Sequence, residues 1–143
     1  MRLRKDAKVE MLRRVPLFKE CTKQQLQSIA SVADELDWPQ GRPIARQGDS
    51  QREFIVIVEG TTDVTIGAKK VGALGAGDFF GEMSLLTRQP RIATVTPMSP
   101  LRVLVITERA FSALLRSDSR IQGKVLAAVA ARAAANEAIL GQQ

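Results

Sequence analysis

The stretch FGEMSLLTRQPRIATV occupies residues 80–95. Gly81 and Glu82 stand at the start of a predicted short helical turn, and Arg91 follows ten residues after Gly81, where a β-like run opens. A helix N-terminus offers free N–H groups and a partial positive charge. An arginine aimed at the same spot adds a planar fork of donors. The spacing therefore predicts a socket for one phosphate group.

The carboxylate of Glu82 is the second informative feature of this stretch. A carboxylate repels a phosphate, so we expect it to accept hydrogen bonds from a pair of hydroxyl groups instead. A phosphate with neighbouring hydroxyls describes a ribonucleotide.

Length and composition restrict the function classes. The chain has 143 residues, which fits one domain, and it contains no histidine and a single cysteine, Cys21. Without histidine, a Ser-His or Cys-His nucleophile pair and a His-based metal site are excluded, and we expect no metal centre. No segment has the length and apolar character of a membrane span or a signal peptide, and the lone cysteine suits a reducing cytoplasm.

The formal net charge of +6 is concentrated at the two ends of the chain. Residues 1–20 carry seven basic and three acidic groups, residues 21–100 carry eight and nine, and residues 101–143 carry six and three. An anionic partner could meet those ends, but solvated helix faces are the simpler interpretation. With one tryptophan and no tyrosine, the chain offers little for base stacking, and we expect no nucleic-acid partner.

The pattern of apolar residues predicts helices at both ends and strands between them. An amphipathic helix is expected within residues 2–14, and a second begins at the capping box of Thr22 and Gln25 and continues to about Trp38. Thr107 is expected to cap a helix, and Ser117 or Ser119 to cap a last one ending near residue 140. Short β-branched runs separated by turns are expected at residues 54–58, 61–66, 71–74, 92–96 and 101–106.

These elements predict a mainly β protein with flanking α-helices. The fold class is an antiparallel β jelly-roll barrel, a double-stranded β-helix, with N-terminal helices and a C-terminal helix pair. We expect residues 1–143 to form a single domain, with N-terminal helices in 1–38, the β-roll in 41–106 and C-terminal helices in 107–140.

Two sequence blocks resemble the cyclic nucleotide-binding domain family of catabolite-type regulators, protein kinase A regulatory subunits and gated channels. The first block is IARQGD at residues 44–49, followed by the apolar residues 54–57 and Gly60. The second is GDFFGEMSL at residues 77–85, continuing to Pro90-Arg91. This second block is similar to the family's phosphate-binding cassette, here expected within residues 80–93.

The resemblance implies a role for each matching residue. Arg91 would pair with the exocyclic phosphate, and backbone N–H groups at Met83 and Ser84 would hold the same phosphate. Glu82 would accept from the ribose 2′-hydroxyl, and Gly81 would let the sugar approach the backbone closely. Taken alone, the residues have simpler explanations too: Arg91 in a surface ion pair, Glu82 at a helix start, and Gly81 for backbone conformation.

Ile92 departs from the family pattern, in which a small residue or a hydroxyl follows the cassette arginine. A threonine there favours guanine in the family, whereas isoleucine offers only apolar contact. The resemblance therefore implies that cAMP is the preferred ligand, with cGMP possible. A bulkier branched side chain could also narrow the pocket.

In the family the final helix covers the base and often pairs with a second copy. Asn136 lies beside the stripe of Ile121, Val125 and Val129, so it could hydrogen-bond the adenine edge. A solvated helix end is the alternative. A homodimer through this helix is possible, and the downstream effector protein is unknown.

The resulting expectation is a non-catalytic cyclic nucleotide sensor in which occupancy is relayed through the C-terminal helix. Neither a DNA-reading domain after the final helix nor a pore before the barrel is recognisable in the sequence. One alternative is a nucleotide-independent interaction or dimerisation module with the same fold. A cupin-type metal enzyme is the other alternative, and the lack of histidine argues against it.

Overall fold

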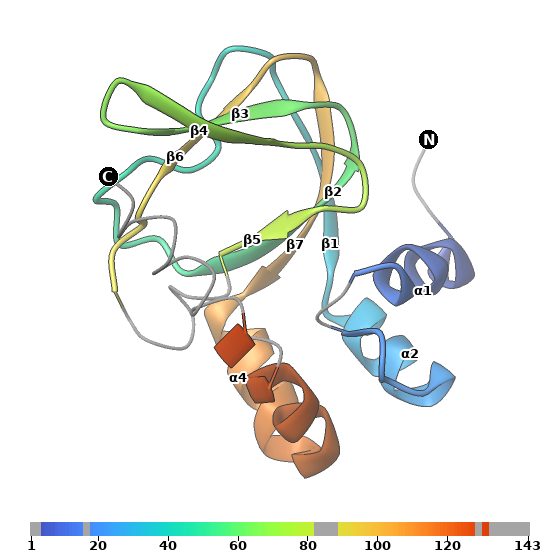
Figure 1. Ribbon diagram of the computed structural model, residues 1–143. Coiled ribbons are helices and arrows are strands. Elements are labelled where there is room, and N and C mark those ends of the chain that lie inside the picture. The colour runs from blue at the N-terminus through green and yellow to red at the C-terminus, as the bar shows by residue number, and fades with distance from the viewer. Residues whose placement is uncertain (1–3, 16–17, 82–88, 128–129, 132–143) are drawn as a thin grey trace.

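Two antiparallel sheets face each other across a shared interior in the computed structural model, which describes residues 4–15, 18–81, 89–127 and 130–131 (Figure 1). The four-stranded sheet has the order β1-β7-β2-β5 and the three-stranded sheet the order β4-β3-β6. The strands are β1 (Asp34–Trp38), β2 (Glu53–Glu59), β3 (Thr62–Ile66), β4 (Lys69–Leu74), β5 (Phe79–Phe80), β6 (Thr94–Pro97) and β7 (Leu101–Thr107).

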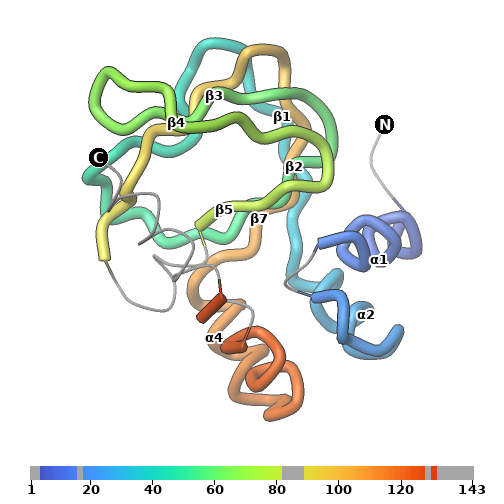
Figure 2. The backbone as a smooth tube through the Cα atoms, viewed as in Figure 1, coloured from blue at the N-terminus to red at the C-terminus, as the bar shows by residue number. Residues whose placement is uncertain are grey.

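The helices lie together at one side of the barrel (Figure 2). They are α1 (Lys5–Arg13), α2 (Lys23–Ser31) and α4 (Glu108–Ser117), and residues 119–127 form a further helical stretch. Thr22 caps α2 in a complete capping box with Gln25, and Thr107 caps α4, as the sequence predicts. The prediction of an antiparallel β barrel with flanking helices is confirmed.

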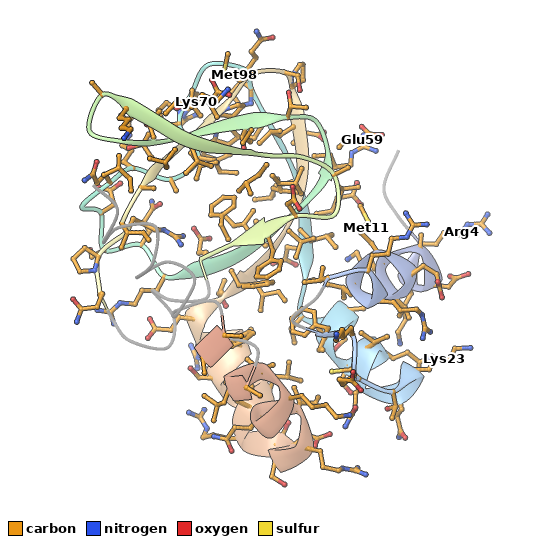
Figure 3. The ribbon with its side chains drawn as sticks, viewed as in Figure 1. Arg4, Met11, Lys23, Glu59, Lys70 and Met98 are labelled. Atoms are coloured by element: carbon orange, nitrogen blue, oxygen red, sulfur yellow. The ribbon has the colours of Figure 1, made fainter. Side chains whose placement is uncertain are left out.

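The central strands β2 and β7 of the four-stranded sheet are buried on both faces. Their side chains alternate between the two faces, so each strand contributes to two clusters. On one face, β2 and β7 contribute to a cluster shared with the helices, which includes Phe54, Val56, Leu104 and Ile106. On the opposite face, the same strands contribute to the barrel interior, through residues that include Ile55, Ile57, Val103 and Val105. Side chains fill the space between the two sheets that a ribbon leaves open (Figure 3).

Phe54 stands at the centre of the cluster between sheet and helices. Its ring centroid lies 5.7 Å from that of Phe18, 5.6 Å from that of Phe79 and 5.8 Å from that of Phe111. These separations fall within the range of favourable aromatic pairs. The four rings therefore join the N-terminal segment, β2, β5 and α4 in one packed unit.

The predicted helix reaching Trp38 is wrong. Helix α2 ends at Ser31, and residues 34–38 form β1 instead, paired antiparallel with β7 along its whole length. This strand lies within the region where only N-terminal helices were expected. Its sequence, DELDW, has no β-branched residue, so the pairing with β7 rather than local preference determines its conformation.

The cap of the last helical stretch also differs from the expectation. Asp118, rather than Ser117 or Ser119, accepts hydrogen bonds from the backbone N–H groups of Arg120 and Ile121. Ser117 donates its hydroxyl back to the carbonyl of Leu114 in α4. Aspartate is as good a capping residue as serine, so composition alone does not distinguish the neighbouring candidates.

Candidate functional site

Arg91 is a buried cation just before β6, with 6 % of its surface exposed. Its Nη2 donates to the backbone carbonyl of Glu53, the first residue of β2, at 3.0 Å. Arginine is almost never buried to this extent unless its charge is matched by partners. The burial therefore argues against an ordinary surface ion pair, which was the simpler explanation for this residue.

The backbone of Arg91 is held by the loop that carries the first sequence block. The N–H of Arg91 donates to the carbonyl of Asp49 at 2.8 Å, and the N–H of Gly48 donates to the carbonyl of Arg91 at 2.8 Å. Further along, the N–H of Gln47 donates to the hydroxyl of Thr94 at 2.9 Å. Ala45 forms an antiparallel bridge with Val95.

Residues 44–49 thus run alongside residues 91–95, and the two blocks that carry the family resemblance lie side by side. By residue type alone, Gly48 and Asp49 are typical of a turn before a strand. Their contact with the site arginine spans more than forty residues of chain, so local pattern could not reveal it. The joint presence of both blocks was the only available signal.

Gly81 follows β5 directly and faces Arg91. Its φ of +100° lies in the region that favours glycine. A Cβ atom built on Gly81 would lie 2.2 Å from the carbonyl oxygen of Glu53 and 2.6 Å from Nη1 of Arg91. Glycine is therefore required here both by conformation and by the close approach of the guanidinium group.

The other residues predicted for the site divide into two groups. Ile92, next to Arg91, has 46 % of its surface exposed, so it has room to contact a ligand. Glu82, Met83, Ser84 and Asn136 lie outside the described residues. The structure thus brings together Arg91 and Gly81, and it adds the Glu53 carbonyl and the Gly48–Asp49 backbone.

Chemically, the described part of the site is a guanidinium group fixed at both ends. The backbone of Arg91 is held by the 44–49 loop, and Nη2 is oriented by a carbonyl. Such a group supplies planar, charge-assisted hydrogen bonds suited to an oxyanion. Within the described ranges, no three His, Cys, Asp or Glu side chains gather in a way that could hold a metal ion.

Comparison with known proteins identifies the class of this fold and site. The sequence model described as "Cyclic nucleotide-binding domain" matches residues 35–118, which is more than half of the chain. The chain therefore belongs to the cyclic nucleotide-binding domain family. The match begins within β1 and ends just beyond α4, so it includes both sequence blocks and strands β2 to β7 completely.

Particular relatives include a cAMP-dependent protein kinase regulatory subunit from Mycosarcoma maydis, 37% identical over 110 residues, which are 71% of this chain and 21% of that protein. The regulatory domain of Toxoplasma gondii PKA, solved with cAMP, is similar in fold: TM-score 0.79, 23% identity, covering 92% of this chain and 50% of that one. The Thermus thermophilus catabolite activator protein aligns with a TM-score of 0.76 and 26% identity, covering 89% and 62%. The chain thus spans about a fifth of the kinase regulatory subunit.

None of the helices in the described ranges is both long and apolar enough to cross a membrane.

Proposed function

We propose that this chain is a non-catalytic cyclic nucleotide sensor that binds cAMP in preference to cGMP. Arg91 receives the cyclic phosphate, and the backbone at Met83 and Ser84 contributes further donors. Glu82 accepts from the ribose 2′-hydroxyl, and Ile92 contacts the base side of the ligand. Family membership and the buried guanidinium of Arg91 support this assignment together. The buried guanidinium is the decisive observation.

The preference for cAMP follows from the chemistry of Ile92. An isoleucine side chain neither donates nor accepts a hydrogen bond, so it leaves the polar edge of guanine without a partner at this position. Adenine and guanine both tolerate an apolar contact. Guanine loses more binding free energy than adenine, because it forgoes a hydrogen bond at this position. The two relatives whose names or titles mention cAMP support the same ligand class.

The proposed output passes through the C-terminal helices. The start of β2 is tied to α4 by an Arg52–Glu108 ion pair of 3.6 Å and by the stacking of Phe54 on Phe111. Between Arg52, which precedes β2, and Phe54 lies Glu53, the first residue of β2, whose carbonyl accepts a hydrogen bond from the Arg91 guanidinium. A ligand that binds Arg91 therefore acts on the chain segment that holds α4. Asn136, further along the chain, is proposed to contact the base.

Calorimetric titration with cAMP and cGMP tests the proposal. We expect wild-type protein to bind cAMP more tightly, and Arg91→Ala to lose at least about tenfold in affinity, since a charge-assisted hydrogen bond contributes roughly 1.5–3 kcal/mol. Arg46→Ala is the matched control, because Arg46 is an exposed arginine in the adjacent loop. Its affinity should stay within about twofold of wild type.

Two results would contradict the proposal. Equal or reversed affinities for the two nucleotides would remove the cAMP preference. No heat of binding and no rise in melting temperature with either nucleotide would favour an interaction or dimerisation module that keeps the fold without the ligand. Hydrogen exchange with and without cAMP addresses the relay, which predicts changed protection in α4 and in residues 119–127.

A further inference from the structure

Phe80 contacts the guanidinium group that the proposed function assigns to the phosphate. The Cζ atom of Arg91 lies over the Phe80 ring, 5.8 Å from its centroid. The ring itself is buried, with 8 % of the residue exposed, and it belongs to the cluster inside the barrel. The pair therefore meets where little water competes with the attraction between a cation and the face of a ring.

The position of this ring is fixed by the sheet. Phe80 pairs with Ile55 in the antiparallel ladder between β5 and β2. Its neighbour Phe79 pairs with Val56 and belongs to the cluster shared with the helices, where it packs against Phe54. Two adjacent phenylalanines thus point to opposite faces of the same two-residue strand, and the one on the barrel face lies under Arg91.

Three sides of the guanidinium are now accounted for. The carbonyl of Glu53 accepts from Nη2, Gly81 leaves room at Nη1, and the face of the Phe80 ring lies beneath Cζ. The carbonyl orients one N–H of the group. The ring favours positions in which the guanidinium carbon stays above its face, because a cation is attracted to that face.

We propose that Phe80 is a positioning residue for phosphate recognition: its ring face holds the Arg91 guanidinium in the orientation that receives the phosphate. The inference rests on the proposed function, and it adds a determinant of affinity that the phosphate itself does not touch. Its effect on binding arises from the charge distribution of the ring, in addition to its volume.

Fluorinated phenylalanines incorporated at position 80 test this role without changing the shape of the core appreciably. Fluorine withdraws electron density from the ring face and weakens its attraction for a cation. Along the series from phenylalanine to trifluorophenylalanine, we expect cAMP affinity to fall progressively, by about threefold to tenfold in total. The same series at position 79 is the control and should change affinity by less than about twofold.

Substitution by leucine gives a second measurement. We expect Phe80→Leu to weaken cAMP binding, and Phe79→Leu to leave the affinity near that of wild type while lowering the melting temperature. The loss caused by Phe80→Leu should shrink in an Arg91→Gln background, because a neutral amide lacks the charge that the ring face attracts. Undiminished loss in that background would mean that Phe80 acts through packing alone.

The outcomes separate this inference from the function on which it rests. Flat affinity across the fluorinated series at position 80, with Arg91→Ala still losing binding, would overturn the role of Phe80 and leave the sensor intact. Failure of the wild-type protein to bind either cyclic nucleotide would overturn both. A progressive loss at position 80 with none at position 79 would establish the positioning role.

Discussion

Two constraints require glycine at position 81: a positive φ and the close approach of neighbouring atoms. Gly77 shares only the first of these constraints. Gly77 has a φ of +91°, close to the +100° of Gly81, but a Cβ atom at Gly77 would meet nothing within 4 Å. At Gly81 the same atom would collide with Glu53 and Arg91. The pair therefore separates backbone strain from the close approach of the guanidinium.

We expect Gly81→Ala to destabilise the protein by clearly more than Gly77→Ala does. Strain alone should cost about 1–3 kcal/mol at either position. The overlap at Gly81 should add roughly 1–3 kcal/mol and should displace Arg91. Urea denaturation measures the first effect and cAMP titration the second. Equal losses in stability at the two positions would show that the contact with Arg91 imposes no constraint.

Ile92 provides a prediction about ligand choice. We expect Ile92→Thr to raise affinity for cGMP relative to cAMP by about twofold to tenfold, because one added hydrogen bond contributes about 0.5–1.5 kcal/mol. Ile92→Val is the matched control, since valine has nearly the shape of threonine but no hydroxyl. The side chain is 46 % exposed, so neither change should greatly alter the melting temperature. An unchanged ratio in the threonine variant would exclude this position from base discrimination.

Sequence reasoning reached the site residues whose type and spacing are informative. Arg91 and Gly81 were predicted from type and spacing, and both lie together in the structure. The Glu53 carbonyl and the Gly48–Asp49 backbone were missed, because main-chain groups carry no signal in a sequence. Phe80 was part of the quoted stretch, but only the pairing of β5 with β2 shows which phenylalanine faces the barrel.

At the scale of elements, strands with strong apolar character were predicted within one or two residues of their observed bounds. The expected run 54–58 is β2 (Glu53–Glu59), and the expected run 101–106 is β7 (Leu101–Thr107). Both strands are buried on two faces, so their β-branched residues form continuous runs. β1 was missed because its one aliphatic residue, Leu36, is 44 % exposed and its buried residue is Glu35.

The buried carboxylate of Glu35 has an ion-pair partner on the neighbouring strand. Arg102 of β7 places its Nε 3.3 Å from Glu35 and 3.3 Å from Asp37. The side chain of Asp37 first, and the nearby carboxylates of Glu59 and Glu35 as well, raise the pKa of Arg102. β1 is therefore held to β7 by ion pairs as well as by backbone hydrogen bonds. A search for alternating apolar residues does not detect ion pairs.

Helix α2 gives a prediction about the contact between the two ends of the chain. Gln25 accepts a hydrogen bond from the N–H of Thr22 at 2.8 Å and another from Lys124 Nζ at 3.1 Å. We expect Gln25→Ala to cost about 1–3 kcal/mol of stability, since it removes a capping-box partner and an acceptor for a cation. Gln24→Ala, on the exposed face of the same helix, should cost less than about 0.5 kcal/mol. Thermal or urea unfolding compares them, and similar losses would contradict the proposed link.

Helix α4 and the stretch after it meet at Asp118. Burial alone would raise the pKa of Asp118, but hydrogen bonds from the backbone of Arg120 and Ile121 lower it below its usual range. The carboxylate therefore stays charged at neutral pH, and a charged acceptor is the better cap for a helix N-terminus. The cap is consistent with a stable junction between α4 and residues 119–127.

At the scale of the whole molecule, the chain builds two clusters that share one sheet, and Cys21 lies in the cluster on the helical side. This cysteine is 7 % exposed, and burial raises the pKa of its thiol, although the charge of Lys124 opposes the shift. The reactive thiolate is therefore scarce at neutral pH. Cys21 can report how often the helices separate from the sheet.

We expect iodoacetamide to modify Cys21 of the folded protein at least about 100-fold more slowly than the urea-unfolded protein at pH 7.5. Ile121→Ala should accelerate the reaction, because Ile121 is 1 % exposed in the same cluster and its truncation leaves a cavity. Mass spectrometry follows the modification. Similar rates for folded and unfolded protein would mean that the helices open independently of the barrel.

The burial of Arg91 has a thermodynamic consequence. Removing a guanidinium from bulk water is costly even when hydrogen bonds compensate for part of the loss. In the folded chain 94% of the surface of Arg91 is already withdrawn from solvent. The free-energy cost of dehydrating the guanidinium therefore lowers the stability of the fold and does not weaken ligand binding. The domain is then less stable than an apolar residue at that position would make it, and the proposed phosphate receptor is correspondingly preorganised.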